Sequence, residues 1–389
     1  MGDSRNSQSM GKISAELVSR RDFLKTASAA ALGAGAFGLG AGFGRLQAEE
    51  QLAVNSLPAS VLGRTGLKVT KISFGGVLIT EPPLLIRVID QGINLIHTAP
   101  AYQNGRSMEA FGKVFKNKGL RDKVVLALKE RPENIDSCLK VLNTDYVDIL
   151  VPPMTSLAEI SDPSVPDNFE KARKAGKARF MGWAGHNNTT EIFDRGRELG
   201  YYDVTLMSYA NIRNASFLEA ARKAREAGIG IFTMKGQPKR NADGSTAEEA
   251  ATFTSLCSSM VNHQHAHSVL ASMGSFQSVD FYRGMLETKL GCRNRTLEDR
   301  YWAQQEGNYC SMCGNCEKVC PFSENIPRIL RYRMYYKDYG LKDYARAKYA
   351  ALNFSSSQLT SQDLECCESV CSRRLPLRSM LDEAHRLLS

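Results

Sequence analysis

The sequence predicts an α/β fold, a (β/α)8 barrel, followed by a small helical module near the C-terminal end of its 389 residues. Short apolar runs alternate with amphipathic helical stretches between about residues 62 and 274, which favours a parallel sheet covered by helices. Eight such runs match the strand number of the barrel, although a doubly wound sheet would give a similar pattern. Seven of the ten cysteines lie beyond the last run, between Cys310 and Cys371, and indicate a separate metal-binding module.

The predicted strands are short and contain few charged residues. They are Val69–Phe74, Ile93–Ile96, Val124–Leu128, Val147–Val151, Phe180–Trp183, Val204–Ser208, Ile229–Met234 and Ser268–Ser272. The helices predicted between them include residues 168–175, 190–199 and 215–227. Glycine follows Ala175 and Ala227, as is typical of helix C-termini.

The charge balance argues against a nucleic-acid-binding protein. The chain carries 50 basic and 41 acidic residues, a formal net charge of +9. The basic residues are spread along the sequence without a long Lys/Arg run, so we expect no nucleic-acid partner.

The most specific motif is Cys310-x2-Cys313-x2-Cys316-x3-Cys320-Pro321, the spacing of a bacterial ferredoxin-type cluster run. Two-residue gaps let a tight loop bring several thiolates to one [4Fe–4S] cube. A zinc knuckle or a set of disulfides is the alternative, but zinc sites usually pair two C-x2-C units across a longer gap. The motif therefore predicts a one-electron redox centre.

A second cysteine group contains Cys366, Cys367 and Cys371. It resembles the second half of a two-cluster ferredoxin, but it lacks two cysteines and the proline of that pattern, so we do not expect a second complete cluster. In two-cluster ferredoxins the fourth cysteine of each run binds the other cluster, which favours Cys371 as the fourth ligand. The simpler alternative is Cys320, and the sequence leaves both open.

Two other clusters permit functional interpretations that we consider weaker than structural ones. Tyrosines interleave with arginines and lysines between residues 331 and 349, which could form an RNA-stacking surface but is more typical of a helix packed on the barrel. His263, His265 and His267 would share one face of an extended segment and could bind a metal ion.

The N-terminal segment resembles a twin-arginine export signal. Residues 19–25 read S-R-R-D-F-L-K, and the uncharged stretch 26–43 is less apolar than a membrane-spanning helix. A protein that acquires its cluster in the cytoplasm must be exported folded, as twin-arginine translocases are understood to do. We therefore expect transport by that translocase to the periplasm, or a membrane anchor if the signal stays uncut.

Motifs between about Ser56 and Ser278 resemble the aldo-keto reductases, including a branch with a C-terminal ferredoxin-like domain. They are V-L-G-R-T-G-L-K-V at residues 61–69, G-I-N-L-I-H-T-A at 92–99, Y-x-N-G-R-S at 102–107, T-D-Y-V-D-I-L at 144–150 and G-K-A-R-F-M-G at 176–182. The resemblance implies a (β/α)8 TIM barrel and carbonyl reduction by hydride transfer from NADP(H).

The resemblance also implies a catalytic set. Tyr102 takes the position of the proton-donating tyrosine, and Lys129 that of the lysine that lowers the tyrosine pKa. Two positions depart from the family: His97 stands where an aspartate would hold the lysine, and Pro153 stands at or beside the position of a carbonyl-orienting histidine. His97 either acts as a displaced acid or carbonyl donor, or lines the pocket of a decayed site.

The same resemblance implies the residues that bind the nicotinamide cofactor. Asn187 would contact the carboxamide, and Tyr209 would stack on the nicotinamide unless it is a core aromatic. Lys235 would lie near the pyrophosphate, and Gly274 and Ser275 would offer backbone N–H groups to a phosphate. Basic residues for a 2′-phosphate are not evident, which leaves the choice between NADP and NAD open.

These observations divide the chain into a signal at residues 1–48, a barrel at 56–295 and a [4Fe–4S] ferredoxin-like module at 296–389. They predict an exported oxidoreductase with a small-molecule substrate and a redox partner protein. The alternative is a non-catalytic barrel that serves as a scaffold for an electron-carrier domain in a redox complex.

Overall fold

The computed structural model describes most of the chain beyond its N-terminal segment. The described residues are 53–186, 189–209, 214–234, 247–262, 266–288, 294–319, 326–352 and 361–389. None of the helices in these ranges is long and apolar enough to cross a membrane.

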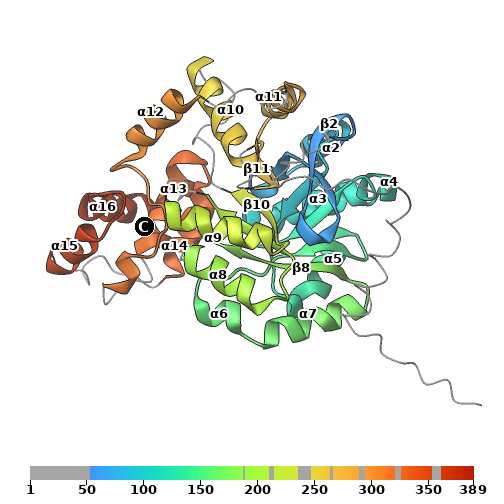
Figure 1. Cartoon of the computed structure of the whole chain (residues 1–389), viewed down its shortest axis with the longest axis horizontal. Coiled ribbons are helices and arrows are strands. Elements are labelled where there is room, and N and C mark those ends of the chain that lie inside the picture. The colour runs from blue at the N-terminus through green and yellow to red at the C-terminus, as the bar shows by residue number, and fades with distance from the viewer. Residues whose placement is uncertain are drawn as a thin grey trace, which may run out of the picture. The chain divides into compact units, whose positions relative to one another are not determined.

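Eight parallel strands close into a barrel in the order β10-β11-β4-β5-β6-β7-β8-β9 (Figure 1). They are β4 Ile72–Gly75, β5 Leu95–Thr98, β6 Val125–Leu128, β7 Val147–Leu150, β8 Ala178–Gly185, β9 Val204–Ser208, β10 Gly230–Met234 and β11 Ser268–Ser272. The predicted (β/α)8 fold is therefore confirmed, and closure of the sheet excludes the doubly wound alternative.

Helices surround the barrel. They are α2 Pro82–Asp90, α3 Arg106–Phe115, α4 Lys118–Arg121, α5 Ile135–Leu142, α6 Leu157–Ser161, α7 Ser164–Lys174, α8 Thr189–Leu199, α9 Ala215–Glu226, α10 Ala247–Asn262 and α11 Phe276–Glu287. Their apolar faces and the outer faces of the strands form the main hydrophobic core.

The first predicted run is wrong in one respect, because Val69–Phe74 contains parts of two strands. Its first half belongs to β3, Lys68–Thr70, which pairs antiparallel with β2, Leu57–Val61, in a sheet that also includes β1, Ala53–Val54. Its second half is β4. The Thr70 N–H donates to the side chain of Asn94 at 2.8 Å, the Lys71 N–H still donates to the carbonyl oxygen of Pro58 of β2 at 2.9 Å, and the chain then enters the barrel.

Alternation along the strands decides which side chains enter the barrel. Leu95, Ala127 and Ile149 belong to a cluster inside the barrel, whereas their neighbours Ile96, Leu126 and Leu150 belong to the core beneath the helices. Successive residues of a strand point to opposite faces. A residue two positions beyond an interior one therefore also faces the barrel axis at the strand end.

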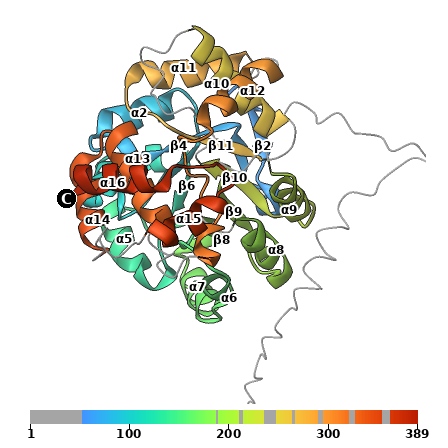
Figure 2. The same ribbon diagram turned by 90° about the vertical axis from the view of Figure 1, so that its left-hand side faces the viewer.

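The C-terminal helices pack around a hydrophobic cluster of their own. They are α13 Ile326–Asp338, α14 Lys342–Ala350, α15 Ser361–Ser369 and α16 Leu377–Leu388; α12 Arg295–Gln305 and the 3₁₀ helix η5 Cys316–Lys318 precede them. Figures 1 and 2 show α13 to α16 against one end of the barrel. An ion pair between Lys318 and Glu191 of α8, at 3.0 Å, joins this module to the barrel.

Candidate functional site

His97 lies inside the barrel at the end of β5. It is two residues beyond Leu95, and its register partners are Gly75 of β4 and Ala127 of β6. Its side chain is completely buried. The ring meets the rings of Tyr102 and Phe232 edge to face, with centroids 5.6 and 6.3 Å apart.

Neither ring nitrogen of His97 has a hydrogen-bond partner among the described residues. Burial, reinforced by the positive charge of Lys129, lowers the pKa of His97 well below its usual value. The imidazole is therefore neutral, with one N–H donor and one acceptor unused. A buried polar group in this state is costly, and such groups in native proteins call for a ligand, a water molecule or a catalytic role.

Tyr102 starts the loop after β5, in the 3₁₀ helix η3, Tyr102–Gly105. Gln103 and Asn104 both adopt left-handed backbone angles, with φ of 52° and 54°. Ser107 fixes this loop, since its hydroxyl donates to the carbonyl oxygen of Gly76 at 2.7 Å and lies 2.9 Å from the hydroxyl of Thr98. The half-buried Tyr102 side chain is thus held over the barrel end.

Lys129 directly follows β6, two residues beyond Ala127, so it faces the same interior. Its backbone N–H donates to the carbonyl oxygen of Thr98 at 2.9 Å, which fixes the strand end. Its ammonium lies over the Tyr102 ring, with Nζ 4.9 Å from the centroid. No carboxylate of the described residues forms an ion pair with Lys129.

Burial is the main cause of the altered pKa values of this pair. It lowers the pKa of Lys129 to about 8, helped by the positive charge of Arg331 and opposed by Glu130. Burial also raises the pKa of Tyr102 well above its usual value, with contributions from Tyr335, Tyr344 and Tyr339. The hydroxyl therefore stays protonated at neutral pH, unlike the lowered pKa that the resemblance implies.

Four residues of the C-terminal module thus act on the barrel site, and the sequence analysis assigned them no role there. Arg331 lies on α13, and Tyr335 stacks on Tyr339 and meets Tyr344, with ring centroids 5.6 and 5.8 Å apart. The sequence held one signal. Arg331 and Tyr335 stand four residues apart and share one face of α13, and Tyr339 follows four residues later, directly after the end of that helix.

Pro153 cannot replace the missing histidine. It extends β7 through an isolated bridge to Ala184, its side chain is exposed, and proline carries no donor. The described imidazole that meets the implied catalytic pair is His97, through its ring contact with Tyr102.

The residues expected to bind a nicotinamide cofactor are only partly described. Asn187 and Lys235 lie outside the described residues. Tyr209 is fully buried and meets Phe217 edge to face at 5.0 Å, so its stacking role stays a prediction. Ser275 is the N-cap of α11 in a capping box with Ser278, after the exposed Gly274, and this leaves the N–H groups of the first turn at Phe276 and Gln277 for another acceptor.

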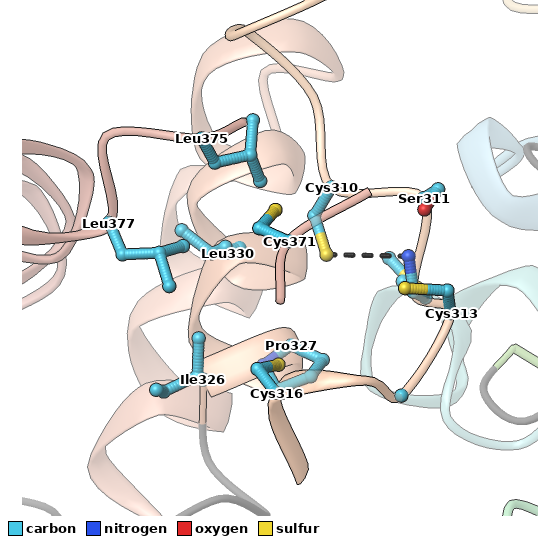
Figure 3. Close-up of a pocket in the computed structure, with 12 residues that line it drawn as sticks. Cys310, Ser311, Cys313, Cys316, Ile326, Pro327, Leu330, Cys371, Leu375 and Leu377 are labelled. Atoms are coloured by element: carbon cyan, nitrogen blue, oxygen red, sulfur yellow. Dashed lines mark hydrogen bonds between the residues drawn. The ribbon is translucent and has the colours of Figure 1, made fainter. Parts of the chain in front are cut away.

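The C-terminal module contains a cysteine-lined cavity (Figure 3). Four cysteines, Cys310, Cys313, Cys316 and Cys371, line it together with apolar residues that include Leu330, Leu375 and Leu377. The empty space among these side chains is ≈ 350 Å³ when the solvent at its open mouth is included. Cys320 lies outside the described residues, so Cys371 is the fourth-ligand candidate that the structure brings to the cavity.

The donor set fits an iron–sulfur cluster, because thiolates are the ligands such clusters use and the walls are apolar. The N–H of Met312 donates to Cys310 Sγ at 3.3 Å, the kind of bond that tunes cluster sulfur ligands. In the described ranges, however, no three potential ligands converge as closely as a bound metal ion requires. The cluster itself is therefore a matter of proposal.

The histidine cluster can be compared with the structure only in part. His263 and His265 lie outside the described residues, whereas His267 is buried and its Nδ1 accepts a hydrogen bond from the N–H of Ile231 at 2.9 Å. Of the cysteines outside the C-terminal group, Cys138 and Cys257 are buried thiols.

Sequence comparison connects the barrel with one family. Residues 82–195 match the model of the aldo/keto reductase family. The chain is 31% identical over 151 residues to the aldo-keto reductase YhdN of Bacillus subtilis, covering 30% of this chain and 44% of that protein. It is 29% identical over 203 residues to L-galactose dehydrogenase of Arabidopsis thaliana, covering 44% of this chain and 63% of that protein.

These matches cover only part of each relative, between about half and two thirds of its length. Among solved structures, one described as an aldo-keto reductase from Pseudomonas aeruginosa superimposes with a TM-score of 0.50 at 19% identity, over 60% of this chain and 95% of that chain. That likeness supports the barrel fold. The sequence matches make this barrel similar to aldo-keto reductases.

Proposed function

We propose that the protein is an aldo-keto-reductase-like oxidoreductase that reduces a carbonyl group at the end of its barrel, using NADP(H). The observation that carries the proposal is the pairing of Tyr102 with Lys129 at the ends of β5 and β6, inside the family-matching segment. Active sites of (β/α)8 enzymes lie at this end of the barrel.

The chain's own residues have distinct roles in this reaction. The Tyr102 hydroxyl donates its proton to the carbonyl oxygen; its raised pKa keeps it protonated at neutral pH but makes it a weaker acid than a free tyrosine. The Lys129 ammonium stabilises the developing negative charge on that oxygen below about pH 8. The unused N–H of neutral His97 orients the carbonyl. When bound, the nicotinamide supplies the hydride.

Cofactor binding would rely on elements at the same barrel end. The N–H groups at the start of α11, next to Gly274 and Ser275, suit a phosphate. Asn187 and Lys235 are proposed on the family resemblance. Tyr209 would need to expose a ring face before it could stack on the nicotinamide.

The C-terminal module would hold a [4Fe–4S] cluster on Cys310, Cys313 and Cys316, with Cys371 as the fourth ligand and Cys320 as the alternative. The shared cavity and its thiol donors support this assignment. The cluster would exchange single electrons with a redox partner protein. Export as a folded protein by the twin-arginine translocase, to the periplasm, is proposed on the segment 19–25.

Titration of the anaerobically purified protein with NADPH and NADH, followed by calorimetry, tests the reductase proposal. We expect one nicotinamide per chain. Tyr102→Phe should retain binding but lose about 10²–10⁴-fold in carbonyl reduction, because the proton donor is removed. Tyr146→Phe, which keeps a ring beneath Arg121, is the matched control. Failure to bind either nucleotide would contradict the proposal.

Iron and sulfide content, together with visible absorbance, tests the cluster separately. Cys371→Ser should lower the cluster content, whereas Cys366→Ser, an exposed cysteine outside the cavity, should leave it unchanged. If the Cys371→Ser variant retained a full cluster, the fourth ligand would be Cys320 instead. A purified protein without iron would contradict the cluster proposal altogether.

A second candidate is a non-catalytic barrel that carries the redox module. The specific observation in its favour is that His97 stands in the aspartate position and no carboxylate of the described residues forms an ion pair with Lys129. On this hypothesis Tyr102→Phe and Lys129→Ala would leave electron transfer through the module intact, and no carbonyl substrate would be turned over.

A further inference from the structure

The segment after Cys371 meets the cysteine loop at one sulfur atom. Ser372 Oγ lies 3.4 Å from Sγ of Cys313, one of the cysteines that line the cavity. We propose that Ser372 is a positioning residue that acts on the cluster through Cys313: its hydroxyl donates a hydrogen bond to the ligand sulfur and raises the reduction potential of the bound cluster. This inference rests on the proposed function, because it concerns the [4Fe–4S] cluster assigned to that cavity.

The chemistry of the two groups fixes the direction of this bond. Between a hydroxyl and a thiol either atom can donate, but a cysteine that binds iron is a thiolate and has no proton to give. Ser372 is then the donor, and a hydrogen bond to a charged acceptor is stronger than one between neutral groups. The Ser311 hydroxyl lies 3.5 Å from Ser372 Oγ, where it can donate to a remaining lone pair and polarise the bond further.

Two further hydrogen bonds hold the same two segments together. The side chain of Asn315 donates to the carbonyl oxygen of Val370 at 3.4 Å, and the Gly307 N–H donates to the carbonyl oxygen of Arg373 at 2.9 Å. Along both segments these bonds lie on opposite sides of the contact between the hydroxyl and the sulfur. The contact therefore belongs to a docked pair of loops, although the Ser372 side chain itself is exposed.

The backbone turns sharply on either side of Cys313. Met312 and Gly314 have φ of 57° and 81°, and a positive φ is uncommon for methionine, whose side chain is buried here. Such a conformation persists where the surrounding contacts enforce it, and it is typical of loops that hold a ligand. In the same turn the Met312 N–H donates to Cys310 Sγ, so two cysteines of this loop, which Figure 3 shows at the cavity, each have a donor beside the sulfur.

Position 372 is also where the chain departs from the ferredoxin pattern, which has a proline after this cysteine. Proline carries neither a hydroxyl nor an N–H, so the serine adds a donor that the pattern lacks. Hydrogen bonds to ligand sulfurs stabilise the reduced cluster, which carries more negative charge, and so raise the potential. The redox partner would accordingly need to exchange electrons at a higher potential than it would with the proline in place.

A redox titration followed by electron paramagnetic resonance (EPR), on the full-length, anaerobically purified protein, tests this inference. Ser372→Ala should lower the equilibrium constant for one-electron reduction about threefold to tenfold, and tenfold corresponds to about 59 mV in midpoint potential. Ser372→Thr keeps the hydroxyl and should keep the wild-type potential. The matched control is Ser379→Ala, which removes an exposed hydroxyl of α16 that donates to the carbonyl oxygen of Pro376 at 3.1 Å, and it should change nothing.

A second variant and a second signal make the test independent of how well Ser372→Ala binds iron. Ser311→Ala leaves the Ser372 hydroxyl in place and removes the group that polarises it, so the potential should shift in the same direction by less. Pulsed EPR of the reduced cluster after exchange into deuterium oxide should show one more coupled deuteron in the wild type than in Ser372→Ala. Unchanged potentials in both alanine variants would overturn the inference, as would an unchanged deuteron signal.

Iron content separates this result from that of the proposed function. A protein that contains the cluster, but whose potential does not respond to Ser372→Ala or Ser311→Ala, retains the cluster assignment and loses this inference. A protein purified without iron loses both.

Discussion

The two ends of the barrel differ in the partners that the described protein supplies to their buried polar side chains. At the N-terminal ends of β6 and β7, Arg121 and Asp148 form a buried ion pair with a 3.0 Å contact. At the C-terminal ends of β5 and β6, His97 and Lys129 lie together without any bond between them or to a carboxylate of the described residues. Both pairs are polar groups in apolar surroundings, the first between the strands and α4 and the second inside the barrel, and they differ in whether the described protein supplies their partners.

The Arg121–Asp148 pair is fully partnered by the protein. Arg121 donates to the hydroxyl of Thr144 and to the carbonyl oxygens of Val124 and Tyr146, all within 3.2 Å. Asp148 accepts from the N–H of Leu126 at 3.0 Å and from Arg179 at 2.7 Å.

This difference indicates which end of the barrel has a structural role. A buried charged side chain with a full set of hydrogen bonds holds helices and strands in position. A buried group with unused donors and acceptors is instead available to a bound ligand. In (β/α)8 barrels the C-terminal strand ends carry the chemistry and the opposite end carries stability. The hydrogen bonds of this protein follow that division.

The largest loss of stability is expected from breaking the Arg121–Asp148 ion pair. Asp148→Ala removes the buried carboxylate and leaves the Arg121 guanidinium without its anion. We expect the free energy of unfolding to fall by about 3–5 kcal/mol. Denaturant titration measures the loss.

An exposed ion pair provides the control for this prediction. Asp136 pairs with Lys177 at 2.6 Å but is 64% exposed. Asp136→Ala should therefore cost no more than about 1 kcal/mol. Equal losses in the two variants would show that the Arg121–Asp148 pair is screened by water rather than buried.

The sequence predicts the barrel well because each strand is a short, local apolar pattern. Seven of the predicted runs each coincide with one barrel strand, within a few residues at each end. The prediction of one strand at Val69–Phe74 was wrong because a continuous apolar run cannot show where the chain leaves one sheet for another. This change occurs near Lys71, whose backbone N–H still donates to the carbonyl oxygen of Pro58.

The candidate site was predictable only in part. Tyr102, Lys129 and His97 follow apolar strands, so their meeting at one barrel end follows from the fold. The effect of Arg331 on the pKa of Lys129 links segments about 200 residues apart, which no local pattern encodes. Cys371 reaches the Cys310 cavity for the same reason, although ferredoxin ligand exchange offered a hint.

A smaller, pH-dependent effect should come from Lys129. Its pKa is about 8 in the folded protein and 10.5 without the fold, so the folded state binds the proton more weakly. The free energy of unfolding of the wild type should therefore rise with pH between about 8 and 10.5. Below pH 8, the destabilisation caused by burying the Lys129 ammonium should be fully present. Lys129→Met, which carries no charge, should be about 1–2 kcal/mol more stable than wild type at pH 7.

The stability difference between wild type and Lys129→Met, measured by denaturant titration from pH 7 to pH 10.5, cancels the titrations that both proteins share. We expect it to shrink to nothing across this range. A difference of constant size, or a less stable variant at pH 7, would mean that an anion already compensates the ammonium and that the two barrel ends are more alike than the hydrogen bonds indicate.

The smallest expected change in the free energy of unfolding comes from replacing either of two buried histidines. Neither ring nitrogen of His97 has a partner in the described part of the chain, whereas His267 accepts a hydrogen bond from Ile231 and its pKa is lowered by burial to about 3. His97→Leu removes unsatisfied polar atoms and should raise the free energy of unfolding by about 1 kcal/mol, while His267→Leu leaves the Ile231 N–H without an acceptor and should lower it by about 1–3 kcal/mol. Thermal and denaturant unfolding of both variants decide the comparison. If His97→Leu is destabilised as much as His267→Leu, the imidazole of His97 has a structural partner, and the distinction between a completed end and an open end of the barrel fails at its central residue.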